Sequence, residues 1–262
     1  QLNREKNDIQ PMLDVRLFRN TVFTGAITAN LISMMVDVGF IYFASQHLQL
    51  VSGLPPMYAG MLLIPGTLAI IIAGLVIARV AVHFHPAQVV SFGLALHAAA
   101  FAVLAFLGAH NDLVIILIFI VLGTGIGIAQ TISNDLMLSS VPPRKAGAAS
   151  AISETSYETG TVLGTVIIGG MLTAVYRANV VVPDGLDETL ADHAHETLGG
   201  AVTVASQVGG EQANQLLSSA FAAFDSGVVL SSAFSAVLMG VMAVISYFMI
   251  RKAPREMKPA DH

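Results

Sequence analysis

Four carboxylate side chains lie well inside long apolar stretches of this sequence, at Asp37, Asp135, Glu154 and Glu158, and a fifth, Asp225, lies at the outer mouth of the last stretch, where it would simply reach water. A charged side chain near the centre of a bilayer costs roughly 2.5–3.5 kcal/mol on insertion scales, and residues retained at that cost usually handle ions, protons or substrates. No Lys or Arg lies in the interior of the same stretches. We therefore predict that these acids face one another, water or a cationic ligand.

Glu154 and Glu158 form the most specific of these patterns, because Tyr157 and Thr161 fall on the same helical face. Carboxylates four residues apart on a helix lie about 5–6 Å apart at Cβ. We expect such a pair to titrate as a unit and to exchange a proton for a bound cation. Tyr157 would offer its ring to an aromatic or quaternary cation. The alternative is that both acids lie in a wet vestibule and titrate normally.

Two further polar stripes follow helical spacing beside the other two acids. Their members are Asn30 and Met34 with Asp37, and Gln130, Thr131 and Asn134 with Asp135. Such stripes also serve simply to hold helices together by hydrogen bonds, which suits Thr131 and Asn134 well. This packing role suits Glu154 and Glu158 poorly, because Gln would form the same hydrogen bonds without burying a charge.

The composition indicates lipid rather than water as the main solvent. Hydrophobic residues make up 55% of the 262 positions and charged residues only 11%, and the mean hydropathy is +0.73. Soluble domains carry about 25% charged residues. Helices of about 20 apolar residues cross a bilayer, and no alternating pattern of a β-barrel is present. Six stretches qualify as spans, roughly 22–45, 58–80, 87–108, 113–138, 147–176 and 221–250.

The basic residues predict the orientation of these spans. Eleven of the twelve Lys and Arg residues fall in alternate connecting segments, and only Arg177 falls in the others. Because Lys and Arg concentrate in cytoplasmic loops, we expect both ends on the cytoplasmic side and the long 177–220 loop outside. The predicted location is a bacterial plasma membrane.

Glycine pairs at a spacing of four predict close helix packing. Gly123 and Gly127 form one pair, and Gly160 and Gly164 form another. The run from Gly123 to Gly127 also contains Gly125, but it lies inside an apolar span with no strand before it. A nucleotide-binding loop is therefore not expected.

Enzyme, metal and nucleic-acid functions find no support in the remaining motifs. His193 and His195 point apart on a short helix, so no metal site is expected there. The sequence contains no cysteine, and its net charge is −5. We predict a protein that is not an enzyme, has no cofactor beyond a coupling proton and does not bind nucleic acid.

Several runs resemble a known family. The run PMLDVRLFRN resembles the cytoplasmic linker after helix eight of the fourteen-helix drug:proton antiporters of the major facilitator superfamily. QLVSGLPPMYAGMLLIPG resembles their next outer loop and helix, and VLGTGIGIA resembles their twelfth helix. The most specific run, VPPRKAGAASAISETSYETGTVLGTVIIGG, resembles the inner loop and the thirteenth helix. Within this family, the runs resemble exporters of quaternary ammonium compounds and methyl viologen.

The resemblance implies an all-α C-terminal half of six transmembrane helices, built as two inverted three-helix repeats. The repeats would cover 22–108 and 109–250, between a cytoplasmic linker, 1–21, and a cytoplasmic tail, 251–262. In this family the substrate cavity lies between two six-helix halves. The N-terminal half, with its own proton-antiport motifs, would be the missing partner.

The resemblance also implies roles for individual residues. The first and fourth spans would line the cavity with Asp37 and Asp135. Glu154 and Glu158 match acids of the thirteenth helix that are implicated in protonation and cation recognition. The remaining cavity residues would be Asn30, Met34, Gln130, Asn134 and Tyr157.

The expected function is proton-driven export of small amphipathic, cationic drugs. A major facilitator exporter of an envelope lipid, a siderophore or a metabolite is the first alternative. A membrane scaffold that transports nothing is the second, and it leaves the embedded glutamates unexplained.

Overall fold

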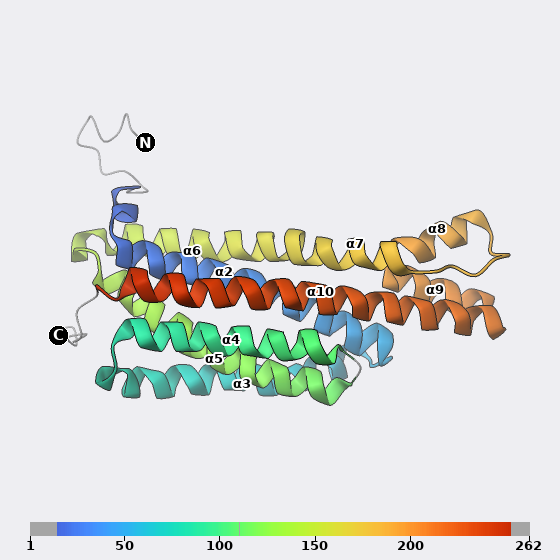
Figure 1. Ribbon diagram of the computed structural model, residues 1–262, viewed down its shortest axis with the longest axis horizontal. Coiled ribbons are helices and arrows are strands. Elements are labelled where there is room, and N and C mark those ends of the chain that lie inside the picture. The colour runs from blue at the N-terminus through green and yellow to red at the C-terminus, as the bar shows by residue number, and fades with distance from the viewer. Residues whose placement is uncertain (1–14, 110, 253–262) are drawn as a thin grey trace.

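The computed structural model describes residues 15–109 and 111–252, and the regular elements of these residues are all helical. Six spans run along one long axis (Figure 1). Each is long enough and apolar enough to cross a membrane, which confirms the predicted all-helical membrane fold. The spans are α2 Thr21–Gln46, α3 Pro56–Val80, α4 Pro86–Leu107, α5 Asp112–Ser139, the composite of α6 Ala146–Leu163, η5 Gly164–Gly169 and α7 Gly170–Asn179, and α10 Gly210–Ile250.

Short elements connect the spans. The π-helical η2 His47–Val51 extends α2, and η5 is a second π-helical segment inside the fifth span. Two short helices, α8 and α9, cover the end of the bundle that lies opposite the start of α2 (Figure 1). The connecting elements are η1 Val15–Arg19, η3 Ala81–His83, η4 Pro143–Lys145, α8 Glu188–Glu196 and α9 Leu198–Val208.

The start of α2 and the end of α10 lie at the same end of the bundle. A Cβ atom at Gly25, near the start of α2, would lie 2.9 Å from Met249 Cβ, near the end of α10. We call this the inner end, and we call the end that carries α8 and α9 the outer end (Figure 1). The helices α2 and α4 run outward, whereas α5 and α10 run inward.

Asparagine caps position two of these helices. Asn20 Oδ1 accepts a hydrogen bond from the Val22 amide at 3.0 Å, and Asn20 Nδ2 donates to Ser140 O at 3.1 Å. Asn111 Oδ1 accepts from the Leu113 amide at 2.8 Å. These side chains satisfy amides at helix starts that have no partner within the helix. Asn20 also ties the start of α2 to the end of α5.

The helix α10 begins eleven residues before the predicted span, at Gly210 instead of 221. Gly209 and Gly210 adopt positive φ angles of 63° and 64°, which glycine tolerates and which let the chain turn from α9 into α10. The added turns are too polar to be recognised as membrane-spanning. They are helical because they pack against α9, with Ala213 and Leu216 buried.

The first glycine pair packs α5 against α3. A Cβ atom at Gly123 would lie 2.4 Å from Gly66 O, and one at Gly127 would lie 2.3 Å from Ile70 O. Both distances are far shorter than an ordinary contact, so only glycine permits this crossing. The predicted role of the pair in helix packing is confirmed.

The second glycine pair packs α6 and the start of η5 against α2. A Cβ atom at Gly160 would lie 2.6 Å from Leu31 O, and one at Gly164 would lie 2.3 Å from Met35 O. The spans form two groups of three in chain order: α2, α3 and α4, then α5, the composite span that begins with α6, and α10. The first helix of each group therefore crosses the second helix of the other group at a glycine pair. This exchange joins the two groups into one body.

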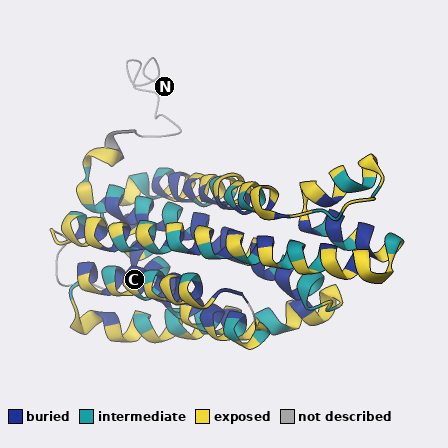
Figure 2. Cartoon of the chain, turned by 45° about the vertical axis from the view of Figure 1, so that its right-hand side comes forward, coloured by how far each residue is buried: buried dark blue, intermediate teal, exposed yellow. Residues whose placement is uncertain are grey.

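The core lies among α2, α4, α5 and α10, because α5 and α10 each pack against both α2 and α4. Many residues along the outer sides of the helices are exposed (Figure 2). They include many large apolar residues. Phe106 is 89% exposed and Val237 is 69% exposed. So large an exposed apolar surface is unfavourable in water, whereas it is favourable in contact with lipid.

Candidate functional site

A triangle of hydrogen-bonded side chains joins three spans in the inner part of the bundle. Asn30 Nδ2 on α2 donates to Asn134 Oδ1 on α5 at 3.0 Å, and Tyr157 Oη on α6 donates to the same oxygen at 3.0 Å. Asn30 Nδ2 also lies 3.2 Å from Tyr157 Oη. Asn30 is only 2% exposed, whereas Asn134 and Tyr157 are half-buried. We call this triangle the polar node; it brings together residues from all three of the polar patterns found in the sequence.

Three of the four predicted acids are exposed beside the polar node. Glu154 and Glu158 flank Tyr157 on α6, and Asp135 follows Asn134 on α5. None of the three forms a hydrogen bond or an ion pair with another described residue. Their negative charge therefore faces away from this bundle, where it attracts protons and cations and repels anions.

Asp37 lies apart from the other acids. It is 8% exposed and is enclosed by helix packing, two turns outward of Asn30 on α2. Its Oδ1 atom has no hydrogen-bond partner among the described residues. Met34 and Gln130 are half-buried, each one turn outward of an asparagine of the polar node. The structure thus brings the predicted site residues together around the node, except for Asp37.

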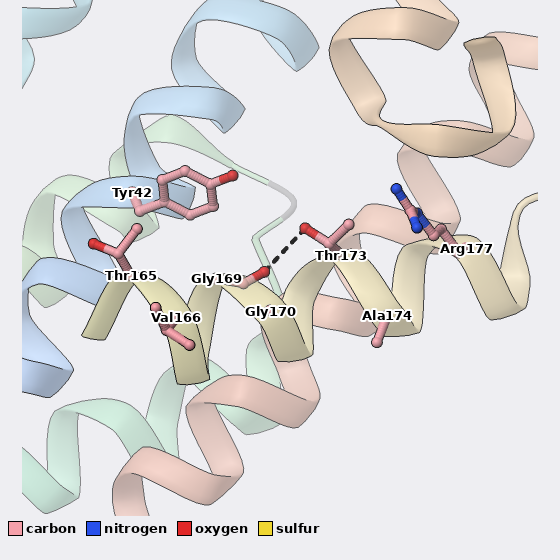
Figure 3. Close-up of a pocket in the computed structure, with 8 residues that line it drawn as sticks. All are labelled: Tyr42, Thr165, Val166, Gly169, Gly170, Thr173, Ala174 and Arg177. Atoms are coloured by element: carbon pink, nitrogen blue, oxygen red, sulfur yellow. Dashed lines mark hydrogen bonds between the residues drawn. The ribbon is translucent and has the colours of Figure 1, made fainter. Parts of the chain in front are cut away.

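A hollow of about 560 Å³ opens beside η5 and α7, outward of Glu158 on the same span (Figure 3). Its size lies within the range of about 300–1,000 Å³ that is usual for ligand sites. Thr173 Oγ1 donates to Gly169 O at 3.0 Å, and Arg177 Nε at the outer rim donates to Glu196 O at 3.1 Å. The hollow is lined by Tyr42, Thr165, Val166, Gly169, Gly170, Thr173, Ala174 and Arg177.

Two polar residues of the structure, Asp112 and His97, were not among the sequence candidates, and Asp225, which was expected at the outer mouth of the last span, has a protein partner there. Asp225 Oδ1 accepts a hydrogen bond from the Ala109 amide at 2.6 Å, so this acid holds the turn between α4 and α5. Asp112 Oδ1 accepts from Ser52 at 2.6 Å at the outer end. His97 is fully buried in α4. A histidine in an otherwise apolar span is a signal that the sequence offers, outside the pattern of carboxylates.

The fold is that of a membrane protein with six candidate spans and an acidic face, and sequence comparison places the chain in a family. The family model described as Major Facilitator Superfamily matches residues 3–165, and the chain belongs to this superfamily. It is 44% identical over 246 residues to the multidrug efflux pump LfrA of Mycolicibacterium smegmatis, covering 93% of this chain and 49% of the relative.

Two further relatives also have names that refer to drug resistance. The methyl viologen resistance protein SmvA of Salmonella typhimurium is 31% identical over 253 residues, which cover 94% of this chain and 50% of the relative. The tetracenomycin C resistance and export protein of Streptomyces glaucescens is 25% identical over 98% of this chain and 49% of the relative. The chain spans about half the length of the curated relatives it matches. It is a multi-pass membrane protein that resembles one half of drug efflux pumps.

Proposed function

We propose that this chain is the C-terminal half of a proton-coupled exporter of amphipathic, cationic drugs in a bacterial plasma membrane. The observation that carries the proposal is the exposed group Glu154, Glu158 and Asp135, which lies beside the polar node and has no basic partner among the residues that the structure describes. A site that binds anions would need Arg or Lys there. The names of the relatives support drugs as the cargo.

The coupling follows from competition between a proton and a drug for the same carboxylates. In this half alone Glu154 and Glu158 are exposed, so the facing N-terminal half has to remove them from water. Two acids one helical turn apart then share a proton when no cation is present. A cationic drug entering from inside displaces that proton. A proton arriving from outside later displaces the drug.

The span that carries the glutamates also provides a route outward. The hollow beside η5 lies on its outer part, and Tyr42 contributes a ring and Thr165 a hydroxyl to the lining. An aromatic ring and hydroxyl groups suit an amphipathic cation that has left the acids. We assign this hollow to the exit side of the pathway, between the two halves.

The alternative cargoes, an envelope lipid, a siderophore or a metabolite, would use the same fold. An anionic lipid or siderophore is disfavoured by the unpaired acids. A scaffold without transport would leave three exposed acids in the spans with no role. Counterflow of a labelled dication in proteoliposomes of the full-length protein separates these functions, because only a cation exporter accumulates the label.

Glu154→Gln and Glu158→Gln in the full-length protein test the proposed coupling site. We expect at least one of them to lose resistance to dicationic drugs at normal expression and to flatten the pH dependence of drug binding. Glu188→Gln, which removes an exposed acid from α8 outside the spans, is the matched control and should behave as the parent. If both span variants keep the parental transport and pH dependence, Glu154 and Glu158 are not the coupling site, and Asp37 and Asp135 become the candidates.

The isolated chain is expected not to transport. One half provides one wall of a cavity, and alternating access needs two bodies that rock against each other. Drug-dependent proton flux by this 262-residue chain alone in proteoliposomes would contradict the proposal that it is half of a transporter.

A further inference from the structure

A groove of about 230 Å³ lies between α2 and α6 in the inner part of the bundle. The two helices meet at its outer end, where a Cβ atom at Gly160 would lie only 2.6 Å from Leu31 O. Inward of this crossing the groove separates the helices, and Ile27, Ile152 and Thr155 line it. Because the crossing closes the outer end, the groove can be entered only from the side or from the inner end.

The short helix η1 contributes the inward part of the groove wall. Phe18 lines the groove and is 46% exposed. Thr24 Oγ1 donates to Phe18 O at 2.8 Å, and the Phe18 ring meets the buried Phe23 ring edge to face, with centroids 5.8 Å apart. These contacts hold η1 against the start of α2, so the phenylalanine is a fixed part of the wall.

The hydroxyl groups in the groove all donate to backbone carbonyls. Thr155 Oγ1 donates to Ala151 O at 2.8 Å, and Thr159 Oγ1 donates to Thr155 O at 2.6 Å. Ser156 Oγ donates across to Ile27 O at 3.3 Å. The other lining side chains are apolar. A bound water needs two to four polar partners, which this surface does not provide, whereas a hydrocarbon chain needs none.

Two basic segments meet at the inner mouth of the groove. Arg19 is exposed and directly follows the phenylalanine of the groove wall. Asn20 Nδ2 donates to Ser140 O at 3.1 Å, which holds the segment after α5 beside η1. That segment carries the exposed Arg144 and the half-buried Lys145, and the first turn of α6 contains no acidic residue. The inner mouth therefore attracts an anionic group and repels a cationic drug.

The groove faces away from the proposed drug site. Thr155 and Thr159 each lie two positions from Tyr157 on α6, which is about 160° around the helix. Tyr157 shares its face with Glu154 and Glu158, the face that we assign to the other half of the transporter. The groove therefore opens to the lipid around the protein and not to the interface between the halves.

We propose that this groove binds an anionic phospholipid, with an acyl chain between α2 and α6 and the phosphate beside Arg19 and Arg144. Basic pockets between membrane helices bind lipid headgroups of this kind. Arginine suits a phosphate, because its planar guanidinium donates two parallel hydrogen bonds. The inference goes beyond the proposed function, since it depends on the membrane fold and on neither the drug nor the coupling proton.

Photoreactive lipids test the site in the full-length protein, reconstituted in phosphatidylcholine with a minor fraction of phosphatidylglycerol. Each lipid in turn carries a diazirine in its acyl chain, and mass spectrometry locates the labelled residues. We expect phosphatidylglycerol to label 152–159 about twenty-fivefold more than phosphatidylcholine per molecule present, at about fivefold for each arginine. Equal labelling by the two lipids overturns the proposal. So does no labelling by either, because another part of the protein then covers the groove.

Two sets of matched variants separate the headgroup contact from the acyl-chain contact. Arg19→Gln with Arg144→Gln should remove the preference for phosphatidylglycerol, whereas Arg79→Gln, which removes an exposed arginine from the inner end of α3, should keep it. Thr159→Trp fills the groove with a large ring and should lose phosphatidylglycerol labelling of 152–159. Thr67→Trp should keep the labelling, because it changes an exposed threonine of α3 that is also bonded to its own helix. An unchanged preference in the double arginine variant, or unchanged labelling in Thr159→Trp, overturns the proposal.

Discussion

Gly164→Ala places a methyl group at one of the closest helix contacts in the structure. The added Cβ atom would lie 2.3 Å from Met35 O, whereas ordinary van der Waals contact begins at 3.4 Å. The obstacle is a backbone carbonyl within a helix, which cannot rotate away as a side chain would. The helices α2 and α6 must therefore separate locally by about 1 Å, and a gap of that size forfeits a quarter to a half of each contact's dispersion energy.

The expected cost is about 1–2 kcal/mol of stability. Inserting a methyl group into a closely packed site typically costs 1–3 kcal/mol, and the better helix propensity of Ala recovers about 0.5–1 kcal/mol. Gly127→Ala should cost the same, because its Cβ atom would lie 2.3 Å from Ile70 O at the matching crossing. Gly240→Ala is the control, because a Cβ atom there meets nothing within 4 Å.

The measurement is reversible unfolding of the full-length protein in mixed micelles, with the same denaturant series for all variants. Gly164→Ala and Gly127→Ala should unfold at lower denaturant than the parent, and Gly240→Ala should match or exceed it. If Gly164→Ala proves as stable as Gly240→Ala, the close approach of α2 and α6 does not require glycine at this position, and the packing argument is refuted.

Three further predictions concern topology and polar contacts. Because the chain has no cysteine, Ser206→Cys should be labelled by an impermeant thiol reagent in intact cells and Ser139→Cys should not; the reverse result would invert the orientation. Tyr157→Phe removes both hydrogen bonds of the Tyr157 hydroxyl in the polar node, the one donated to Asn134 and the one accepted from Asn30. At about 0.6 kcal/mol for each bond, the average in membranes, it should cost about 1.2 kcal/mol in the same unfolding assay, whereas Asn134→Leu should cost more because it leaves two donors without their shared acceptor. Asp225→Ala should speed amide exchange in the turn between α4 and α5, and unchanged exchange would show that the 2.6 Å contact does not hold that turn.

Much of the fold could be predicted from the sequence, because the bilayer imposes a simple constraint. Backbone groups in hydrocarbon must bond within the span, so an apolar run of about 20 residues implies a helix. This reasoning found all six spans, and the spacing of the glycines indicated close crossings. It missed the first turns of α10, since 211–220 are helical through packing on α9 and not through contact with lipid.

The sequence by itself determined the residue types and their helical faces, including the pair Glu154 and Glu158 and the absence of basic residues beside it. Only the tertiary structure decided which acid is enclosed and which is exposed. Asp37 and Glu158 are equally conspicuous in the sequence, yet helix packing encloses one and leaves the other on the surface. Periodicity reports one helix at a time, whereas burial depends on which neighbour covers each face.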